Sequence, residues 1–190
     1  MKQLRPEDRA ALVAFDQAVF QRQPLTSDFA SLGGALRDTT RGGRTSLVDA
    51  MFAGISLAEG GDRRTLVLVF TDGVDTGSWL EPETIVEVAR RSSVVVYGVS
   101  ASSAGSTSDT LRQVASATGG EVLDGASTKL ETAFTGVLNE FRHRYLLTFS
   151  PATASAPGWH RLDVRVKRRG TTIKARAGYF VPSRTSERTP

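Results

Sequence analysis

Two short segments of the chain carry the side chains best suited to chemistry. The first, Thr71-Asp72-Gly73-Val74-Asp75, places two carboxylates directly after a strongly apolar run. The second, Gly42-Gly43-Arg44-Thr45-Ser46, is a glycine turn that ends in two hydroxyl groups. Mg²⁺ prefers such oxygen ligands, since it takes few from the protein and keeps several of its waters. If the two segments lie close together, the sequence predicts an all-oxygen site for a hard cation.

Each of these features also has a purely structural interpretation. Thr45 or Ser46 at the start of a helix is typical of an N-cap, and Asp72-Gly73 after a strand is typical of a turn. Gly42-Gly43 does not match a phosphate-binding loop, because no Lys-Ser/Thr pair follows and the preceding segment has a helical pattern. His143 lies beside a helix end, where we expect it to stabilise the helix C-terminus rather than to catalyse a reaction.

The composition excludes several classes of site. The 190 residues contain no cysteine, which excludes a disulfide scaffold, a cysteine zinc site and a cysteine nucleophile. Only two histidines are present, His143 and His160, and they leave little for zinc binding or acid–base chemistry. No apolar run approaches the roughly 18 residues that span a membrane. The first ten residues also lack the apolar core of a signal peptide.

Charge is distributed unevenly along the chain. Residues 1–141 carry 13 basic and 18 acidic side chains, whereas residues 142–190 carry 11 basic and 2 acidic ones. A basic region can contact nucleic acid or an anionic surface. Because Arg165, Lys167 and Arg169 alternate with other residues, however, the pattern is more typical of a solvated strand face. Contact of this region with an anionic polymer, as in an envelope protein, stays open as an alternative.

Alternating strands and helices are expected to position the two polar segments. The patterns predict strands at residues 10–15, 18–22, 65–70, 94–99 and 121–123, and helices at residues 27–38, 45–58, 83–91, 107–118 and 127–141. The first two strands form an antiparallel hairpin, and the apolar run 65–70 is typical of a strand buried on both faces. This order predicts an α/β fold, with a doubly wound, mostly parallel sheet and helices on both faces. Both polar segments then reach the carboxyl edge of the sheet, where ligands bind in such folds.

The C-terminal part has a different pattern. Residues 145–149, 161–166 and 172–177 alternate apolar and polar side chains, which predicts a small antiparallel β meander with its tight turn at Arg169-Gly170. Three short strands need a surface to cover their apolar face, so we expect the meander to pack against the helix that ends near Phe141. The predicted organisation is an α/β domain over residues 1–142, a strand extension over residues 143–181 and a disordered tail over residues 182–190.

Several of these motifs together resemble the von Willebrand factor type A domain. The resemblance covers residues 5–181 and is closest to a bacterial, acidobacterial-type subgroup in which a strand segment and an Arg-x-Gly-Tyr motif follow the domain. The motifs that carry it are Gly42–Ala50, Leu66–Gly77, Val96-Tyr97-Gly98-Val99, Ala117-Thr118-Gly119-Gly120, Tyr145–Pro151 and Arg176-Ala177-Gly178-Tyr179.

The resemblance implies a metal-ion-dependent adhesion site on the upper edge of the sheet. In the family that site is built from an Asp-x-Ser-x-Ser loop, a threonine and the aspartate of a Thr-Asp-Gly motif. By resemblance, Thr45 matches the threonine and Asp72 the aspartate. The implied function is non-enzymatic: Mg²⁺ binds an acidic residue of a partner protein. The implied location of the parent protein is outside the cytoplasm, and no nucleic-acid partner is implied.

One part of the family pattern is missing from the sequence. No Asp-x-Ser-x-Ser motif occurs before residue 45, so we expect an N-terminal truncation that removes the first strand and its metal loop. The metal site would then be incomplete and Mg²⁺ binding weak or absent. In the family the first strand lies between those matching residues 10–15 and 65–70. Its loss would leave these two strands without a partner or force them together.

An enzymatic alternative stays open at this stage. An α/β hydrolase- or phosphatase-like fold could use Asp72 or Asp75 as nucleophile or base. Against it, the sequence contains no Gly-x-Ser-x-Gly elbow and no histidine near these two residues.

Overall fold

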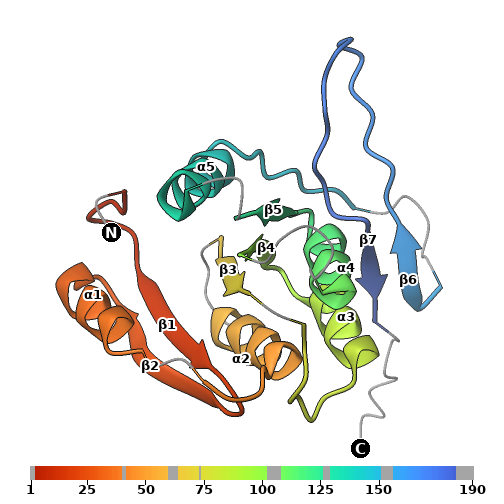
Figure 1. The fold of residues 1–190 in the computed structure, drawn as a ribbon. Coiled ribbons are helices and arrows are strands. Elements are labelled where there is room, and N and C mark those ends of the chain that lie inside the picture. The colour runs from red at the N-terminus through yellow and green to blue at the C-terminus, as the bar shows by residue number, and fades with distance from the viewer. Residues whose placement is uncertain are drawn as a thin grey trace, which may run out of the picture.

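The computed structural model describes residues 3–39, 42–59, 64–72, 74–101, 108–125, 129–150 and 156–182. Twelve elements are assigned in this part of the chain (Figure 1). In chain order they are β1 (Ala10–Phe15), β2 (Val19–Thr26), α1 (Phe29–Arg37), α2 (Leu47–Ala58), β3 (Leu66–Thr71), α3 (Pro82–Arg91), β4 (Val95–Ser100), α4 (Asp109–Thr118), β5 (Val122–Asp124), α5 (Leu130–Arg142), β6 (Gly158–Arg161) and β7 (Gly178–Val181). The order of strands and helices agrees with the sequence prediction as far as α5.

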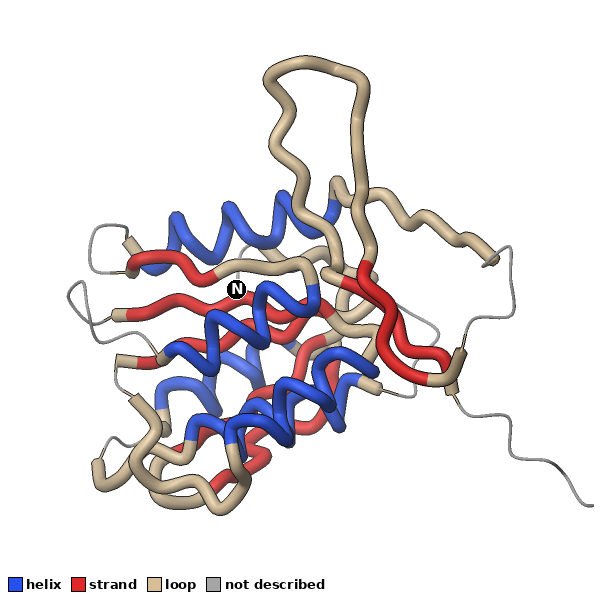
Figure 2. The backbone as a smooth tube through the Cα atoms, turned by 90° about the vertical axis from the view of Figure 1, so that its right-hand side faces the viewer, coloured by secondary structure: helices blue, strands red, loops and turns tan. Residues whose placement is uncertain are grey.

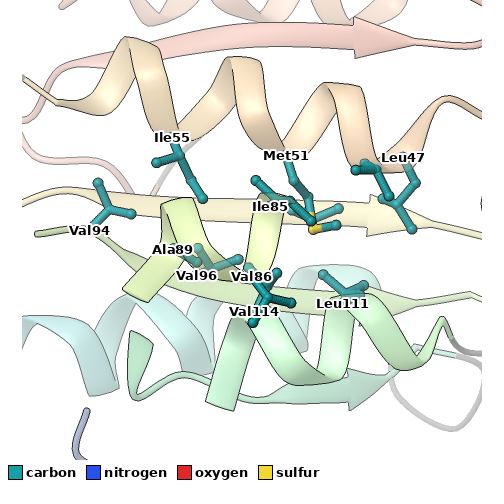
Figure 3. Packing of buried hydrophobic residues seen from close by; sticks show 12 residues of the cluster. Leu47, Met51, Ile55, Ile85, Val86, Ala89, Val94, Val96, Leu111 and Val114 are labelled. Carbon is teal, nitrogen blue, oxygen red and sulfur yellow. The ribbon is translucent and has the colours of Figure 1, made fainter. Parts of the chain in front are cut away.

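A parallel three-stranded sheet of order β3-β4-β5 forms the centre of the molecule. Leu68 of β3 lies opposite Tyr97 of β4, and Gly98 of β4 lies opposite Val122 of β5. Helices α2, α3 and α4 contribute to one core cluster with Val69 and Val96 on one face of this sheet (Figure 3). On the other face, Tyr97 contacts Glu140 of α5. The predicted α/β fold with helices on both faces of a parallel sheet is therefore confirmed.

The main core explains why these segments form helices. Leu47, Met51 and Ile55 recur at helical spacing along α2, and each is at most 1% exposed. Ile85 of α3 and Leu111 of α4 are fully buried beside them. Burying one such side chain contributes about 1.5–3 kcal/mol relative to leaving it in water. This burial fixes α2, and with it the two hydroxyl residues that precede it.

The hairpin of β1 and β2 forms a second sheet of its own. Helix α2 packs against both β1 and β3, and the Ser46 backbone N–H donates to the Asp16 carbonyl, 2.7 Å away. Among the described residues, β1 pairs only with β2, and β3 pairs only with β4. Strands β1 and β3 therefore do not pair with each other, and each has one edge without a partner strand in the described part of the chain.

The C-terminal prediction was right about a small antiparallel sheet but wrong about its strands. Only β6 and β7 pair, with Trp159 opposite Phe180, and residues 145–149, 162–166 and 172–177 lie outside any strand. The sheet forms where α3 can cover it: the Arg91 guanidinium lies 4.1 Å from the Phe180 ring centroid, and Arg90 lies 5.4 Å from that of Trp159. The middle of the connection 162–177 projects past the body, where no element covers it (Figures 1 and 2), whereas Lys174 and Arg176 near its end contact the body. Without such cover, three short strands are too weak to pair.

A second contact holds the C-terminal part to α5. Lys174 donates to the carboxylates of Glu121 and Glu140, the latter at 2.8 Å. Glu140 also accepts from the buried Tyr97 hydroxyl and from Arg144, at 3.2 Å. Burial and the Glu140 hydrogen bond raise the pKa of Tyr97 to about 12, so the phenol stays protonated. The extension therefore packs back on the domain, as predicted, but mainly through α3 rather than α5.

No helix in the described ranges is long and apolar enough to cross a bilayer. The expected tail almost wholly coincides with residues 183–190, which lie outside the described residues.

Candidate functional site

The candidate site lies where the carboxyl end of β3 meets the N-terminus of α2. Thr71 ends β3, and Asp72 follows it with an exposed side chain. Thr45 and Ser46 directly precede α2, with Thr45 half-buried and Ser46 only 1% exposed. Gly73, which belongs to the same motif, lies outside the described residues.

The loop after β3 is bonded directly to the start of α2. The backbone N–H groups of Thr76 and Gly77 both donate to the Thr45 carbonyl, at 2.9 and 3.0 Å. The Thr45 N–H in turn donates to the Thr76 hydroxyl, 3.0 Å away, and the Arg44 Nε donates to the Thr76 carbonyl at 2.6 Å. The residues that directly follow the first polar segment therefore contact the second.

Asp75 caps α2 from outside the helix. One carboxylate oxygen, Oδ2, accepts from the Val48 N–H at 2.8 Å and from the Ser78 hydroxyl. The other, Oδ1, accepts from the backbone N–H groups of Ser78 and Gly77, at 3.1 and 3.3 Å. Ser46 is the N-cap residue by position, but its side chain makes no cap hydrogen bond. The simple N-cap interpretation is therefore wrong for Ser46, because the free helix N–H is satisfied by Asp75 instead.

These hydrogen bonds determine the ionisation of Asp75. Partial burial alone would raise the pKa of its carboxyl group. The hydrogen bonds from Ser78, Val48 and Gly77 outweigh burial and hold the pKa below its ordinary value. A carboxylate with a lowered pKa and four donors already bound is a poor nucleophile or general base. The enzymatic alternative that relied on Asp75 is not favoured.

Asp49, in the first turn of α2, fixes the rest of the loop. Its two carboxylate oxygens accept from the backbone N–H groups of Trp79 and Leu80, both at 3.0 Å, and its own N–H donates to the Ser78 hydroxyl at 3.1 Å. The sequence analysis did not select Asp49, although an acidic residue in a first helical turn is a recognisable signal. These hydrogen bonds hold the backbone of the loop, and Trp79 is 92% exposed.

The side chains at this edge offer the type of oxygen donor that a hard cation prefers, but only a few such donors. Thr45 and Asp72 contribute a hydroxyl and a carboxylate, and the buried Ser46 hydroxyl has no hydrogen-bond partner among the described residues. All three are the oxygen donors that Mg²⁺ accepts. No group of three or more acidic or histidine side chains in the described ranges could hold a metal ion. The donor set fits a weak, open site rather than a closed one.

The two histidines lie away from this edge. His143 is the C-cap residue of α5, and its Nδ1 lies 2.6 Å from the Asn139 carbonyl, so its predicted helix-end position is confirmed. His160 had no obvious partner in the sequence. In the structure its Nε2 lies 2.7 Å from the Ala156 carbonyl, and its ring stacks on Tyr179.

Comparison with known proteins identifies the family of the fold. The family model of the von Willebrand factor type A domain matches residues 1–136. The chain belongs to this family. Domains of the von Willebrand factor type A family are in general protein-interaction modules rather than enzymes.

Two solved structures show the same fold at low sequence identity. An aerotolerance-related membrane protein of Bacteroides fragilis with multiple mutations to serine matches with a TM-score of 0.56 and 15% identity, over 73% of this chain and 81% of that one. The conserved hypothetical protein BatB of Bacteroides thetaiotaomicron matches with a TM-score of 0.50 and 17% identity, over 75% and 83%. No curated protein matches the chain.

Proposed function

We propose that this von Willebrand factor A domain binds a partner protein at the edge formed by Asp72, the N-terminus of α2 and the loop of residues 74–80. The exposure of Trp79 is the observation that carries this proposal. Its indole is 92% exposed, while its backbone is held by Asp49. Tryptophan is enriched among the residues that dominate interface energies, and a rigid loop loses little entropy on binding.

Thr45 and Asp72 would hold a Mg²⁺ ion at this edge. When bound, the ion would supply a localised positive charge with an open position for a carboxylate of the partner. The chain's own contribution is orientation, because the contacts with Thr76 and Gly77 fix Thr45 before any partner arrives. With so few ligands, we expect binding of Mg²⁺ no tighter than about the millimolar range.

The metal part of the proposal is tested by titration with Mg²⁺ alone. Calorimetry of the wild-type chain should give weak binding that Asp72→Ala removes. The matched control is Asp38→Ala, which removes an exposed carboxylate at the C-terminal end of α1. Equal binding by the wild-type and Asp72→Ala proteins would place the ligands elsewhere.

The interaction part is tested by comparing two equally exposed aromatic residues. Trp79 and Tyr145 are both 92% exposed, but only Trp79 lies on the proposed edge. A binding partner captured by the wild-type chain should be lost with Trp79→Ala and retained with Tyr145→Ala. The opposite result, or loss with both variants, would contradict the proposed surface.

A further inference from the structure

The long connection between β6 and β7 is the most prominent feature of the molecular surface. Its residues 162–177, called the β6–β7 arm below, project from the body in two perpendicular views (Figures 1 and 2). At its base the Leu162 N–H donates to the Ala177 carbonyl at 2.9 Å. At its tip the chain reverses through Gly170, whose φ of 71° lies in the left-handed region that glycine adopts easily.

Some basic side chains of the arm bond to the body of the domain, and others do not. Near the base, Lys174 bonds to Glu121 and Glu140, and Arg176 donates to the carbonyls of Ala89 and Arg90. At the tip, Lys167, Arg168 and Arg169 are exposed, and none of the three forms an ion pair within the described part of the chain. The arm is therefore anchored at one end and carries three uncompensated positive charges at the other.

Exposed aliphatic side chains flank these charges. Val164 and Val166 on the outgoing half of the arm are 38% and 52% exposed, and Ile173 on the returning half is 39% exposed. Near the base, the segment 145–149 exposes Tyr145 by 92% and Leu146 and Leu147 by 76% each. The Phe149 ring joins this segment to β7, with its centroid 5.3 Å from that of Tyr179. Adjacent exposed apolar residues of this kind mark surfaces that contact a partner or a membrane.

We propose that the β6–β7 arm docks this domain onto an anionic lipid bilayer. Basic residues near such a surface each contribute about 1 kcal/mol of attraction. The headgroup boundary can also bury the neighbouring valine and isoleucine side chains. This combination distinguishes the bilayer from nucleic acid, which attracts the cations but offers no matching apolar layer. It also distinguishes the bilayer from a partner protein, which would need a pocket shaped for both sides of a narrow arm, whereas a fluid interface needs none.

The hollow beside the arm offers no competing ligand site. It has a volume of about 540 Å³ and is lined by Asn139, Glu140, His143, Arg144, Thr172 and Lys174. Its charged groups already bond to one another, as Glu140 does with Lys174 and Arg144. The free charge of this region is therefore at the tip of the arm.

The first test measures vesicle binding by the full chain. We expect co-sedimentation with vesicles of phosphatidylcholine and phosphatidylglycerol, no binding to phosphatidylcholine alone, and weaker binding at high salt. The triple variant Lys167→Ala, Arg168→Ala, Arg169→Ala should lose at least tenfold in affinity. The control Arg5→Ala, Arg37→Ala, Arg112→Ala removes the same charge from exposed positions elsewhere and should bind like the wild type. Equal losses in both variants would overturn the proposal.

A second test separates the bilayer from other polyanions and from a protein. The variant Val164→Ser, Val166→Ser, Ile173→Ser keeps every charge, so it should lose affinity for anionic vesicles but keep its retention on heparin. Retention on heparin by the wild type without vesicle binding would overturn the proposal in favour of a soluble polyanion. Absence of both would favour an acidic protein surface and would overturn it equally. Circular dichroism and thermal melting of each variant exclude unfolding as the cause.

Because the sequence contains no cysteine, a single introduced cysteine can carry a dye that reports how deeply the arm enters the bilayer. Thr171→Cys places a single thiol at the tip of the arm, and Thr135→Cys places one at a half-buried position on α5. An environment-sensitive dye at position 171 should shift to the blue with anionic vesicles, while the dye at position 135 should not. A shift at position 135 alone would contradict docking through the arm. These results leave the proposed partner site untouched, because that site uses different residues.

Discussion

At the scale of single residues, the side chains that resemble catalytic groups mostly hold the structure together. Asp75 satisfies the start of α2, and Asp49 satisfies the backbone of Trp79 and Leu80. Each carboxylate therefore closes one side of the same loop. In the proposed function, the oxygen ligands at this edge are those of Thr45 and Asp72, and the apolar contact is made by Trp79.

Replacement of Asp75 by asparagine should destabilise the domain. We expect a loss of about 1–2 kcal/mol at pH 7, because the variant loses a charged acceptor and a helix cap. Chemical denaturation measures the loss, and Asp72→Asn, which alters an exposed carboxylate, is the control. Because the pKa of Asp75 is lowered on folding, its contribution is present above its ordinary pKa of 3.8 and disappears as the pH falls through the folded value. The difference in free energy of unfolding between the variant and the wild type should therefore shrink below about pH 4. A difference that stays constant with pH would contradict this account.

The candidate site at the carboxyl end of β3 and the N-terminus of α2 could be predicted from the sequence only in outline. The two polar segments were selected because strand ends and helix starts converge in a parallel sheet, and Thr45 and Asp72 within them because they match the family's metal-site motif. The capping by Asp75 could not be predicted, because it links residues 27 positions apart through the folded loop. For Asp49 the local signal existed, but the exposure of Trp79 depends on a contact 30 positions away. Such long-range hydrogen bonds leave no periodic pattern in the sequence.

At the scale of elements, prediction succeeded where burial dictates the pattern. Helix α2 and strand β3 were predicted to within two residues at each end, because buried side chains fix their periodicity. The prediction of a three-stranded C-terminal meander was wrong, because an alternation of apolar and polar residues does not by itself supply a surface that covers the strands. Only the four-residue strands beside α3 formed, and residues 162–177 between them lie outside any strand.

The end of α4 allows a matched test of two glycines. Gly119 has a φ of 81°, and an added Cβ would lie 2.9 Å from backbone atoms of Ala175 and Arg176. Gly119→Ala should therefore destabilise the domain by about 1 kcal/mol or more. Gly136 lies inside α5 with nothing within 4 Å of an added Cβ, so Gly136→Ala should stabilise it by about 0.5–1 kcal/mol. Thermal melting of both variants measures whether each substitution stabilises or destabilises the domain. A change in the same direction for both would contradict the assigned conformations.

The ionic contact of Lys174 should control how firmly the arm is held. Burial would lower the pKa of Lys174, but its bonds to Glu121 and Glu140 raise it. For Glu140, burial would raise the pKa, but bonds from Lys174, Tyr97 and Arg144 lower it. The contact is therefore fully present between about pH 4.5 and 10.5, the ordinary values of the two groups, and weakens beyond their folded values.

Lys174→Met should accordingly loosen the arm at neutral pH without unfolding the domain. We expect faster hydrogen exchange and faster proteolysis in residues 162–177, with a melting temperature close to that of the wild type. Lys167→Met, at the free tip, is the control and should change neither rate. Equal protection of the arm in the wild type and in Lys174→Met would show that the contact with α5 is dispensable.

At the scale of the whole molecule, α2 joins the hairpin of β1 and β2 to the sheet of β3, β4 and β5. Strands β1 and β3 each leave one edge unpaired among the described residues, and on β3 the side chain of Phe70 is 42% exposed. An apolar strand with an open edge is a template for pairing with another chain. Helix α2 packs against β1 and β3, and the bond from Ser46 to Asp16 joins the start of α2 to the hairpin.

We therefore expect the chain studied alone to associate at micromolar concentrations. Light scattering or sedimentation should show an apparent molecular mass that increases with protein concentration, because the open strand edges pair with other chains. Phe70→Lys places a charge on the open strand and should suppress association, because a charged edge strand resists further pairing. Phe52→Lys is the matched control, since Phe52 is similarly exposed, at 38%, but lies on α2 rather than on a strand. A monomeric wild type with a single sharp unfolding transition, or equal suppression by both variants, would show that the open edges do not govern the behaviour of the molecule.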